Sequence, residues 1–276
     1  KKFEQIKNLT NNIRNIFRDK NYPILIDQEG GRVNRLNKLI ETSVLTAEYF
    51  GKLFKNKKKK FNYYYKIYIS QISYLLNEIG ININTGPVLD LRRSKSSNVI
   101  GDRSYSSLAR NVSTIGDFAI REFNKGKIGT VIKHIPGHGL AKVDSHKKTP
   151  VVKKKANYLY KNDFLPFKKK KTFFAMTAHV IYKDIDPINT ATHSSKIIKL
   201  IRSKIGFKNI IISDDISMRG LKHSIKVNVL RALSAGCNLI LHCNANYVEM
   251  ITVAKNSPVV DNFIIKKTSQ FYNFLS

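Results

Sequence analysis

Short apolar runs that each end in charged or imidazole side chains recur along this chain, and this recurrence constrains its fold. Six such runs begin near residues 23, 83, 128, 173, 209 and 238, and segments with helical spacing of apolar residues lie between them. Strands that alternate with helices form parallel sheets through right-handed crossovers. We therefore predict an α/β protein. The residues at the ends of the runs are Asp27, Asp90, Lys133 and His134, His179, Asp214 and His242.

The polar ends distinguish between the two common parallel architectures. The active site of a (β/α)8 TIM barrel lies at the carboxyl ends of all its strands, whereas an open doubly wound sheet gathers its site at one switch point. Because every unit here has a polar end, we predict the barrel. The six units are two short, so about the first two strands are expected to precede Lys1. Residues 1–276 are then a single barrel domain, incomplete at its amino terminus.

The spacing of apolar residues also predicts the helices. We expect a break at the lysine run 57–60, and Gly80 suits the carboxyl-terminal cap of the helix that precedes it. The expected helical segments are 2–18, 47–79, 108–125, a lysine-rich stretch between 151 and 167, 194–205, a segment ending near 235, and two near 248 and 263.

The formal net charge of +30 results from 49 Lys and Arg residues against 19 Asp and Glu residues. This excess is typical of proteins that bind polyanions. The lysines are spread over the whole chain, however, which also fits a solvated surface that has drifted under biased base composition. Both interpretations stay open, although we predict no nucleic-acid partner. No apolar stretch approaches the ~20 residues that span a bilayer, so we predict no membrane partner.

The two cysteines, Cys237 and Cys243, cannot form a disulfide framework. We expect both to be buried thiols of a protein from a reducing, intracellular setting.

The stretch from Gly126 to Pro150 carries three of the seven histidines within thirteen positions. Asp144 and His146 lie two residues apart on a glycine-hinged loop, where the carboxylate can orient the imidazole as an acid/base pair. A zinc site at His134, His138 and His146 is the rival interpretation. Because the spacings of these histidines do not follow a helical ligand pattern, we predict no metal.

Two carboxylates, Asp214 and Asp215, directly follow a strongly apolar run. A carboxylate at the mouth of a barrel can act as a nucleophile or balance a developing cation, and one of the two is expected to cap the next helix instead. Arg32, Arg35 and Arg103 supply guanidinium groups at the same rim. Such groups bind carboxylates or vicinal hydroxyls, which favours a polar substrate such as a sugar.

Six motifs then occur in an order that resembles glycoside hydrolase family 3. Within that family, the chain is most similar to the bacterial β-N-acetylglucosaminidases (β-N-acetylhexosaminidases) of cell-wall recycling. The motifs are LIDQEGGRVNRL at 25–36, GPVLDL at 86–91, IGDRSY at 100–105, KHIPGHG followed by DSH at 133–146, TAHVIY at 177–182, and GFKNIIISDDISM at 206–218.

The resemblance implies a retaining exo-glycosidase that removes terminal β-linked N-acetylglucosamine from muropeptide fragments through a covalent glycosyl-enzyme intermediate. Asp214 would be the nucleophile, and His146, paired with Asp144, would be the general acid and base. The resemblance further implies a cytoplasmic enzyme without a metal or organic cofactor, which we expect to be a monomer. The residues that would bind the terminal N-acetylglucosamine are Asp27, Arg35, Arg103, Lys133 and His134.

Two alternatives remain open at the level of sequence. The same residues would serve a phosphorylase, which transfers the sugar to phosphate instead of water. The high positive charge and the expected lack of two strands would also fit a degenerate, non-catalytic binding protein that carries a basic surface.

Overall fold

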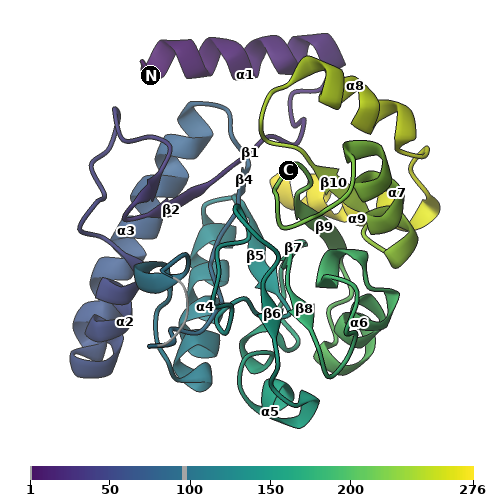
Figure 1. The fold of residues 1–276 in the computed structure, drawn as a ribbon. Coiled ribbons are helices and arrows are strands. Elements are labelled where there is room, and N and C mark those ends of the chain that lie inside the picture. Colours follow the sequence, from purple (N-terminus) through teal and green to yellow (C-terminus); the bar gives the residue numbers. More distant parts are fainter. Residues whose placement is uncertain (1, 95–97) are drawn as a thin grey trace.

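The computed structural model describes residues 2–94 and 98–276, and Figure 1 shows helices around a central sheet. The sheet has six strands in the order β1-β4-β5-β7-β9-β10, and their pairings are parallel. This order follows the sequence without the reversal of a doubly wound sheet, so the six predicted units and their barrel-type topology are confirmed. The strands are β1 (Leu25–Ile26), β4 (Ile83–Asn84), β5 (Gly129–Ile135), β7 (Phe174–Thr177), β9 (Ile210–Asp215) and β10 (Leu239–Leu241).

The helices agree with most of the predicted segments. Lys57 separates α2 from α3, as the lysine run predicted, and Gly80 follows α3 with a φ of +75°. The stretch from 151 to 167 is helical only in α5 and in a 3-10 turn over Leu165–Phe167. The helices are α1 (Phe3–Phe17), α2 (Ala47–Asn56), α3 (Lys58–Glu78), α4 (Ala109–Lys125), α5 (Ala156–Lys161), α6 (Ser195–Leu200, continued by a π-helical turn over Ile201–Ile205), α7 (Ile225–Ala235), α8 (Tyr247–Asn256) and α9 (Asn262–Leu275).

Two short strand pairs lie outside the predicted pattern. β2 (Gln28–Gly30) and β3 (Val33–Asn34) form an antiparallel pair that no apolar run predicted. Its ladder has no apolar alternation, and the side chain of Gln28 supports it by accepting hydrogen bonds from Arg35 N and Leu36 N. β6 (Val151–Val152) pairs with β8 (Ile181–Tyr182) in parallel.

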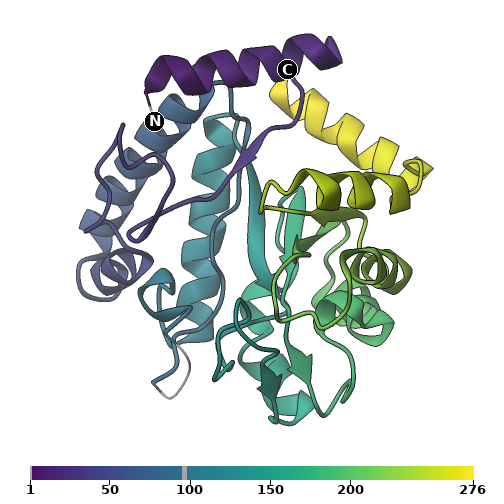
Figure 2. The same cartoon turned by 45° about the horizontal axis from the view of Figure 1, so that its top comes forward.

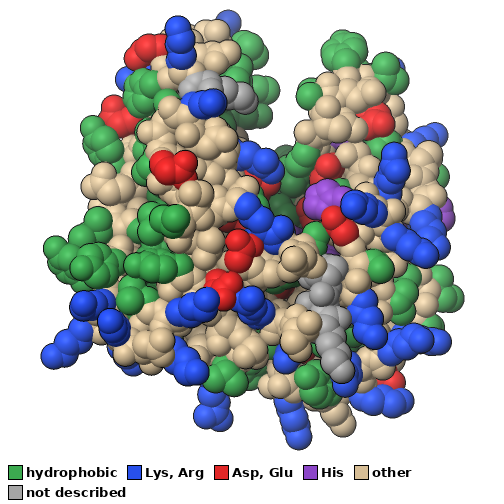
Figure 3. Space-filling model, turned by 60° about the vertical axis from the view of Figure 1, so that its left-hand side comes forward, with side chains coloured by type: hydrophobic (Ala, Val, Ile, Leu, Met, Phe, Trp, Pro, Cys, Tyr) green, Lys and Arg blue, Asp and Glu red, His purple; other side chains and the backbone are tan. Residues whose placement is uncertain are grey.

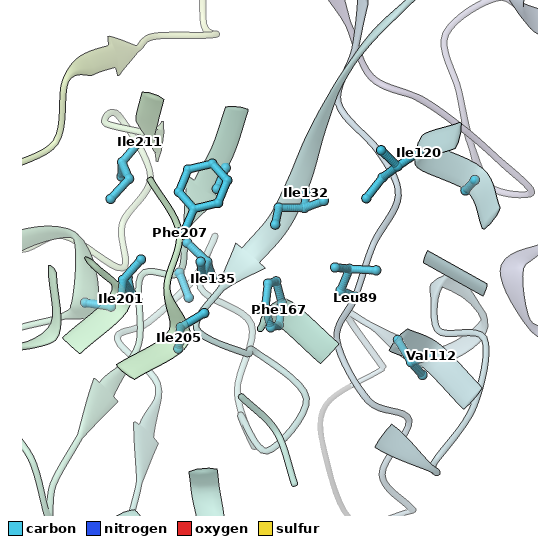
Figure 4. Packing of buried hydrophobic residues seen from close by; sticks show 14 of the residues in the cluster. Leu89, Val112, Ile120, Ile132, Ile135, Phe167, Ile201, Ile205, Phe207 and Ile211 are labelled. Atoms are coloured by element: carbon cyan, nitrogen blue, oxygen red, sulfur yellow. The ribbon is translucent and has the colours of Figure 1, made fainter. Parts of the chain in front are cut away.

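The sheet has an apolar layer on each face. Figure 4 shows the outer layer, in which side chains of the sheet meet those of the surrounding helices and loops. The inner layer includes Val131, Phe174 and Ile210, which the strand register places side by side, and Phe271 from α9 packs against it. Residues two apart on a strand share a face, so each inward series continues toward the carboxyl ends of the strands.

The two ends of the sheet differ in what covers them. Figures 1 and 2 show α1 and α9 at one end of the molecule, with β6, β8 and α5 at the other. Fully buried Phe271 lies so near the start of β5 that a Cβ at Gly129 would come within 2.6 Å of its ring. This amino end of the strands is therefore sealed by apolar side chains, and the carboxyl end is left for polar ones.

Candidate active site

The inward-facing series of two strands, β5 and β9, change from apolar to polar at the carboxyl end. On β5 the series runs from Val131 to Lys133, and on β9 it runs from Ile212 to Asp214. Lys133 pairs in register with Met176 of β7, and Met176 pairs with Ile212. Lys133 and Asp214 therefore lie directly beyond the inner apolar layer, at the carboxyl ends of their strands.

A cavity of about 190 Å³ opens at this end. Its lining contains every predicted site residue except Asp144, which supports one of them from behind. Figure 3 shows a face hollowed by a cleft between two lobes, with acidic, basic and histidine side chains along it. The predicted residues that line the cavity are Asp27, Arg35, Arg103, Lys133, His134, His146 and Asp214.

A network of alternating charges forms one wall of the cavity. Lys133 Nζ lies 2.7 Å from Asp27 Oδ1 and 2.6 Å from Glu29 Oε1, and it donates a further hydrogen bond to Thr85 Oγ1. Arg103 binds both carboxylate oxygens of Glu29 at 2.8 Å. Two acids and two bases thus neutralise one another at a site that is largely withdrawn from water.

The network keeps its members ionised. Burial opposes the charge of Glu29, but Lys133 and Arg103 outweigh it and hold the pKa of the carboxyl well below its usual value. Burial likewise opposes the charge of Lys133, and Glu29 and Asp27 raise the pKa of the ammonium in return. The exposed Arg35 lies 3.7 Å from Asp27 and adds a cation at the rim.

Asp90 joins the end of β5 to the loop that follows it. This fully buried carboxylate accepts hydrogen bonds from His134 N at 3.2 Å and His138 N at 2.6 Å, and it lies 2.6 Å from His134 Nδ1. With its Nδ1 held by Asp90, the side chain of His134 lines the cavity. The neighbouring His138 is neutral at physiological pH, because burial lowers the pKa of its imidazole to about 4.

Asp144 and His146 form the predicted pair. Asp144 Oδ1 lies 2.8 Å from His146 Nδ1 and accepts a hydrogen bond of the same length from His146 N. The His146 side chain is 66% exposed, so its second ring nitrogen is open to the cavity and to solvent. Partial burial opposes the charge of Asp144, but these contacts lower the pKa of the carboxyl.

Asp214 and Asp215 have different environments. Asp215 accepts hydrogen bonds from Ser217 N and Cys243 N, so it is the carboxylate that shapes the turn after β9. Burial would raise the pKa of Asp214, but His134, His179 and the hydrogen bond from Asp215 N lower it. Asp214 is therefore ionised at the cavity, as a nucleophile requires.

Some side chains at or near the cavity were missed by the sequence predictions, and others were misplaced. Glu29 and Asp90 were not assigned to the site, although the first lies in a quoted motif and the second ends an apolar run. Arg32 was expected at the rim, but it pairs with Asp102 at 2.8 Å and is absent from the cavity lining. Cys243 was expected to be buried, and it is exposed and lines the cavity.

The described parts of the chain hold no group of three His, Cys, Asp or Glu side chains that could bind a metal ion. The rival zinc interpretation therefore has no ligand set there. Among the same residues, no helix has the length and apolar character needed to cross a membrane.

Curated sequences similar to this chain are named beta-hexosaminidase. The one from Haemophilus ducreyi is 32% identical over 231 residues, which are 80% of this chain and 65% of that protein. The one from Thioalkalivibrio sulfidiphilus is 32% identical over 252 residues, which are 88% of this chain and 71% of that protein. The chain thus spans about two thirds of the length of these relatives.

Solved structures share the fold. NagZ from Neisseria gonorrhoeae matches with a TM-score of 0.86 and 25% identity over all of this chain and 79% of that one. A glycoside hydrolase family 3 beta-N-acetylglucosaminidase from Paenibacillus matches with a TM-score of 0.83 and 26% identity over 99% of this chain and 53% of that one. Residues 1–270 match the glycosyl hydrolase family 3 N-terminal domain, the same family that the motifs indicated, so the chain belongs to glycosyl hydrolase family 3.

Proposed function

We propose that this protein is a β-N-acetylhexosaminidase that removes terminal β-linked N-acetylglucosamine with retention of configuration. The observation that carries the proposal is that an ionised carboxylate, Asp214, and an exposed imidazole, His146, line one cavity beside a wall of fixed charges. The names of the relatives support the choice of sugar.

The charged wall is suited to bind the sugar. Hydroxyl groups of a pyranose can donate to carboxylate oxygens and accept from ammonium or guanidinium groups at the same time. Before any ligand arrives, Asp27 and Lys133 are held by their ion pair and Arg103 is held by its ion pair with Glu29, which limits the entropy lost on binding. His134, oriented by Asp90, and Arg35 at the rim complete the proposed sugar site.

In the first step, a carboxylate oxygen of Asp214 attacks the anomeric carbon. The bond from that carbon to the aglycone oxygen breaks, and His146, protonated and paired with Asp144, donates its proton to the departing oxygen. A covalent glycosyl-enzyme intermediate results.

In the second step, the neutral imidazole of His146 takes a proton from water. The water oxygen attacks the anomeric carbon, the bond to Asp214 breaks, and the sugar leaves with its original configuration. Asp144 stabilises the cationic imidazole formed at this step.

Turnover of 4-nitrophenyl N-acetyl-β-glucosaminide by the full chain tests the nucleophile. Asp214→Ala should abolish release of nitrophenol, and added azide should restore it by occupying the space of the missing carboxylate and forming a glycosyl azide of inverted configuration. Unchanged turnover in Asp214→Ala would refute the assignment.

A comparison of leaving groups tests His146. His146→Ala should slow hydrolysis of an alkyl glycoside by about 10²- to 10⁴-fold, the usual contribution of a general acid, and affect the nitrophenyl glycoside less. Nitrophenolate leaves without protonation, whereas an alkoxide does not. Equal losses on both substrates would contradict a role as general acid.

We further propose that the natural substrates are muropeptide fragments, and that the protein acts as a cytoplasmic monomer without a cofactor. Both follow from the resemblance to cell-wall recycling enzymes. We propose hydrolysis over transfer to phosphate, and the products formed with and without inorganic phosphate distinguish the two. Formation of the sugar 1-phosphate would identify a phosphorylase. Salt-dependent binding to polyanions without glycosidase activity would instead favour the basic binding protein.

A further inference from the structure

We propose that Ser145 is a positioning residue that fixes the Asp144–His146 pair relative to Asp214. It does so through contacts with His138 on one side and Gly220 on the other. This inference rests on the proposed function, because it concerns the placement of the proposed general acid.

Ser145 is the buried member of an otherwise exposed segment. It is 3% exposed, whereas the side chains of Asp144 and His146 are 28% and 66% exposed. The two contacts between Asp144 and His146 set the angle of the imidazole ring, but they do not attach the segment to the barrel. The buried residue between the two makes two contacts that provide such an attachment.

The first contact attaches Ser145 to the end of β5. Ser145 Oγ lies 3.2 Å from Nε2 of His138, a side chain that is 2% exposed. Asp90 accepts a hydrogen bond from His138 N and also lies 2.6 Å from His134 Nδ1. One buried chain of polar contacts therefore connects the proposed sugar-binding histidine to the centre of the acid/base segment.

The second contact attaches the segment to the loop that follows β9, the strand in which Asp214 lies. Gly220 lies directly against the backbone of Ser145, because a Cβ at Gly220 would come within 2.7 Å of Ser145 O. Thr149 Oγ1 donates a 2.8 Å hydrogen bond to Gly220 O. The loop that holds the proposed acid thus packs on the loop that follows the strand of the proposed nucleophile, at a position where there is no room for a side chain.

Displacement of the segment should affect proton transfer more than sugar binding. A general acid must lie within hydrogen-bond distance of the departing oxygen, and small misplacements in an active site reduce rates strongly. The wall formed by Asp27, Lys133 and Arg103 makes its contacts without this segment. Loss of either contact should therefore lower kcat for substrates that need protonation and leave KM nearly unchanged.

Kinetics of Ser145→Ala and Gly220→Ala on an alkyl and a nitrophenyl N-acetyl-β-glucosaminide test the proposal. Each variant should lower kcat on the alkyl glycoside by about tenfold or more, part of the ~10²–10⁴ that a general acid contributes, and change the nitrophenyl rate less. The loss should have a different cause in each variant: Ser145→Ala lacks the hydroxyl that contacts His138, and Gly220→Ala introduces a Cβ that clashes with the backbone of Ser145. Gly220→Ala remains informative if Ser145→Ala does not fold.

Ser194→Ala is a matched control. Ser194 is also fully buried, and its hydroxyl binds Asp186 Oδ2 at 2.6 Å outside the cavity lining. This variant should lower the melting temperature without altering the ratio of the two rates. If Ser145→Ala selectively loses kcat on the alkyl glycoside and Ser194→Ala does not, the loss reflects positioning and not general destabilisation.

His146→Ala separates this inference from the proposed function. If His146→Ala gives the selective loss and neither Ser145→Ala nor Gly220→Ala does, the positioning role is wrong while the general acid stands. If His146→Ala slows both substrates equally, the proposed acid itself is wrong. A raised KM with an unchanged kcat in Ser145→Ala would make Ser145 a substrate contact and overturn the proposal.

Discussion

Replacement of Glu29 by Gln tests whether the charged wall of the cavity is held together by this carboxylate. Glu29 is the shared partner of Lys133 and Arg103, and the three side chains are 7%, 3% and 13% exposed. The native set of Asp27, Glu29, Lys133 and Arg103 carries two negative and two positive charges. The amide of Glu29→Gln leaves one buried cation in excess.

The expected cost follows from this burial. Removal of one partner of a buried ion pair destabilises a protein by about 3–5 kcal/mol. The entropy of unfolding scales with length, at about 2.1 cal/mol/K per residue, and is roughly 0.6 kcal/mol/K for a chain of 276 residues. The melting temperature of Glu29→Gln should therefore fall by about 5–9 °C at pH 7.

The cost should depend on pH in a defined direction. The native pKa of Glu29 lies below that of an unfolded glutamate, about 4.3. The ionised carboxylate therefore stabilises the fold fully above that value, and the contribution is lost as the pH falls through the native pKa. The difference between wild type and Glu29→Gln should be constant near neutrality and shrink below about pH 4.

Thermal unfolding followed by circular dichroism between pH 3 and pH 8 measures this difference. Glu48→Gln is the matched control, because the partners of Glu48, Lys52 and Arg92, are 70% and 45% exposed. Exposed pairs contribute about 0–1 kcal/mol each, so loss of these two pairs should leave the control within about 3 °C of wild type. Equal shifts in the two variants, or a Glu29→Gln shift at pH 3 that is as large as the shift at pH 7, would refute the reasoning.

Two further predictions concern the supports of the site and its opposite end. Asp90→Asn should raise KM for the N-acetylglucosaminide and destabilise the protein by about 1.5–3 kcal/mol. The reason is that an amide cannot accept all the hydrogen bonds that Asp90 receives. An unchanged KM would mean that other residues set the orientation of His134. Phe271→Ala should destabilise the protein by about 3–5 kcal/mol in thermal unfolding and leave KM unchanged, because the ring of Phe271 fills the inner core at the amino end of the strands. A change in KM would contradict the view that the amino and carboxyl ends of the sheet act independently.

The sequence predicted most of the central sheet, because each strand is an apolar run that stops at a polar residue. β5 and β9 are the clearest cases, and their inward series end at Lys133 and Asp214. Asp144 and His146 were predictable as a pair because they are two residues apart and make a local contact. The antiparallel strands β2 and β3 were not predicted, because their support is polar.

Partners that are distant in sequence could not be predicted from local patterns. Glu29 has the same sequence context whether or not Lys133 lies beside it, and only the folded sheet brings them within 2.6 Å. Arg32 and Arg35 are equivalent in a motif, yet one binds Asp102 and the other reaches the cavity. The choice between such residues depends on the direction of each side chain, which residue type and spacing do not determine.

The apolar seal at the amino end of the strands has a consequence for engineering this protein. Substitutions at sites that are far apart and share no partners usually have additive effects on free energy. Improved packing around Phe271, as at Phe173 and Phe174, which contact its ring, should raise heat tolerance without altering turnover. Conversely, libraries directed at the cavity for new sugars can accept destabilising changes, provided that compensating substitutions are introduced at the sealed end.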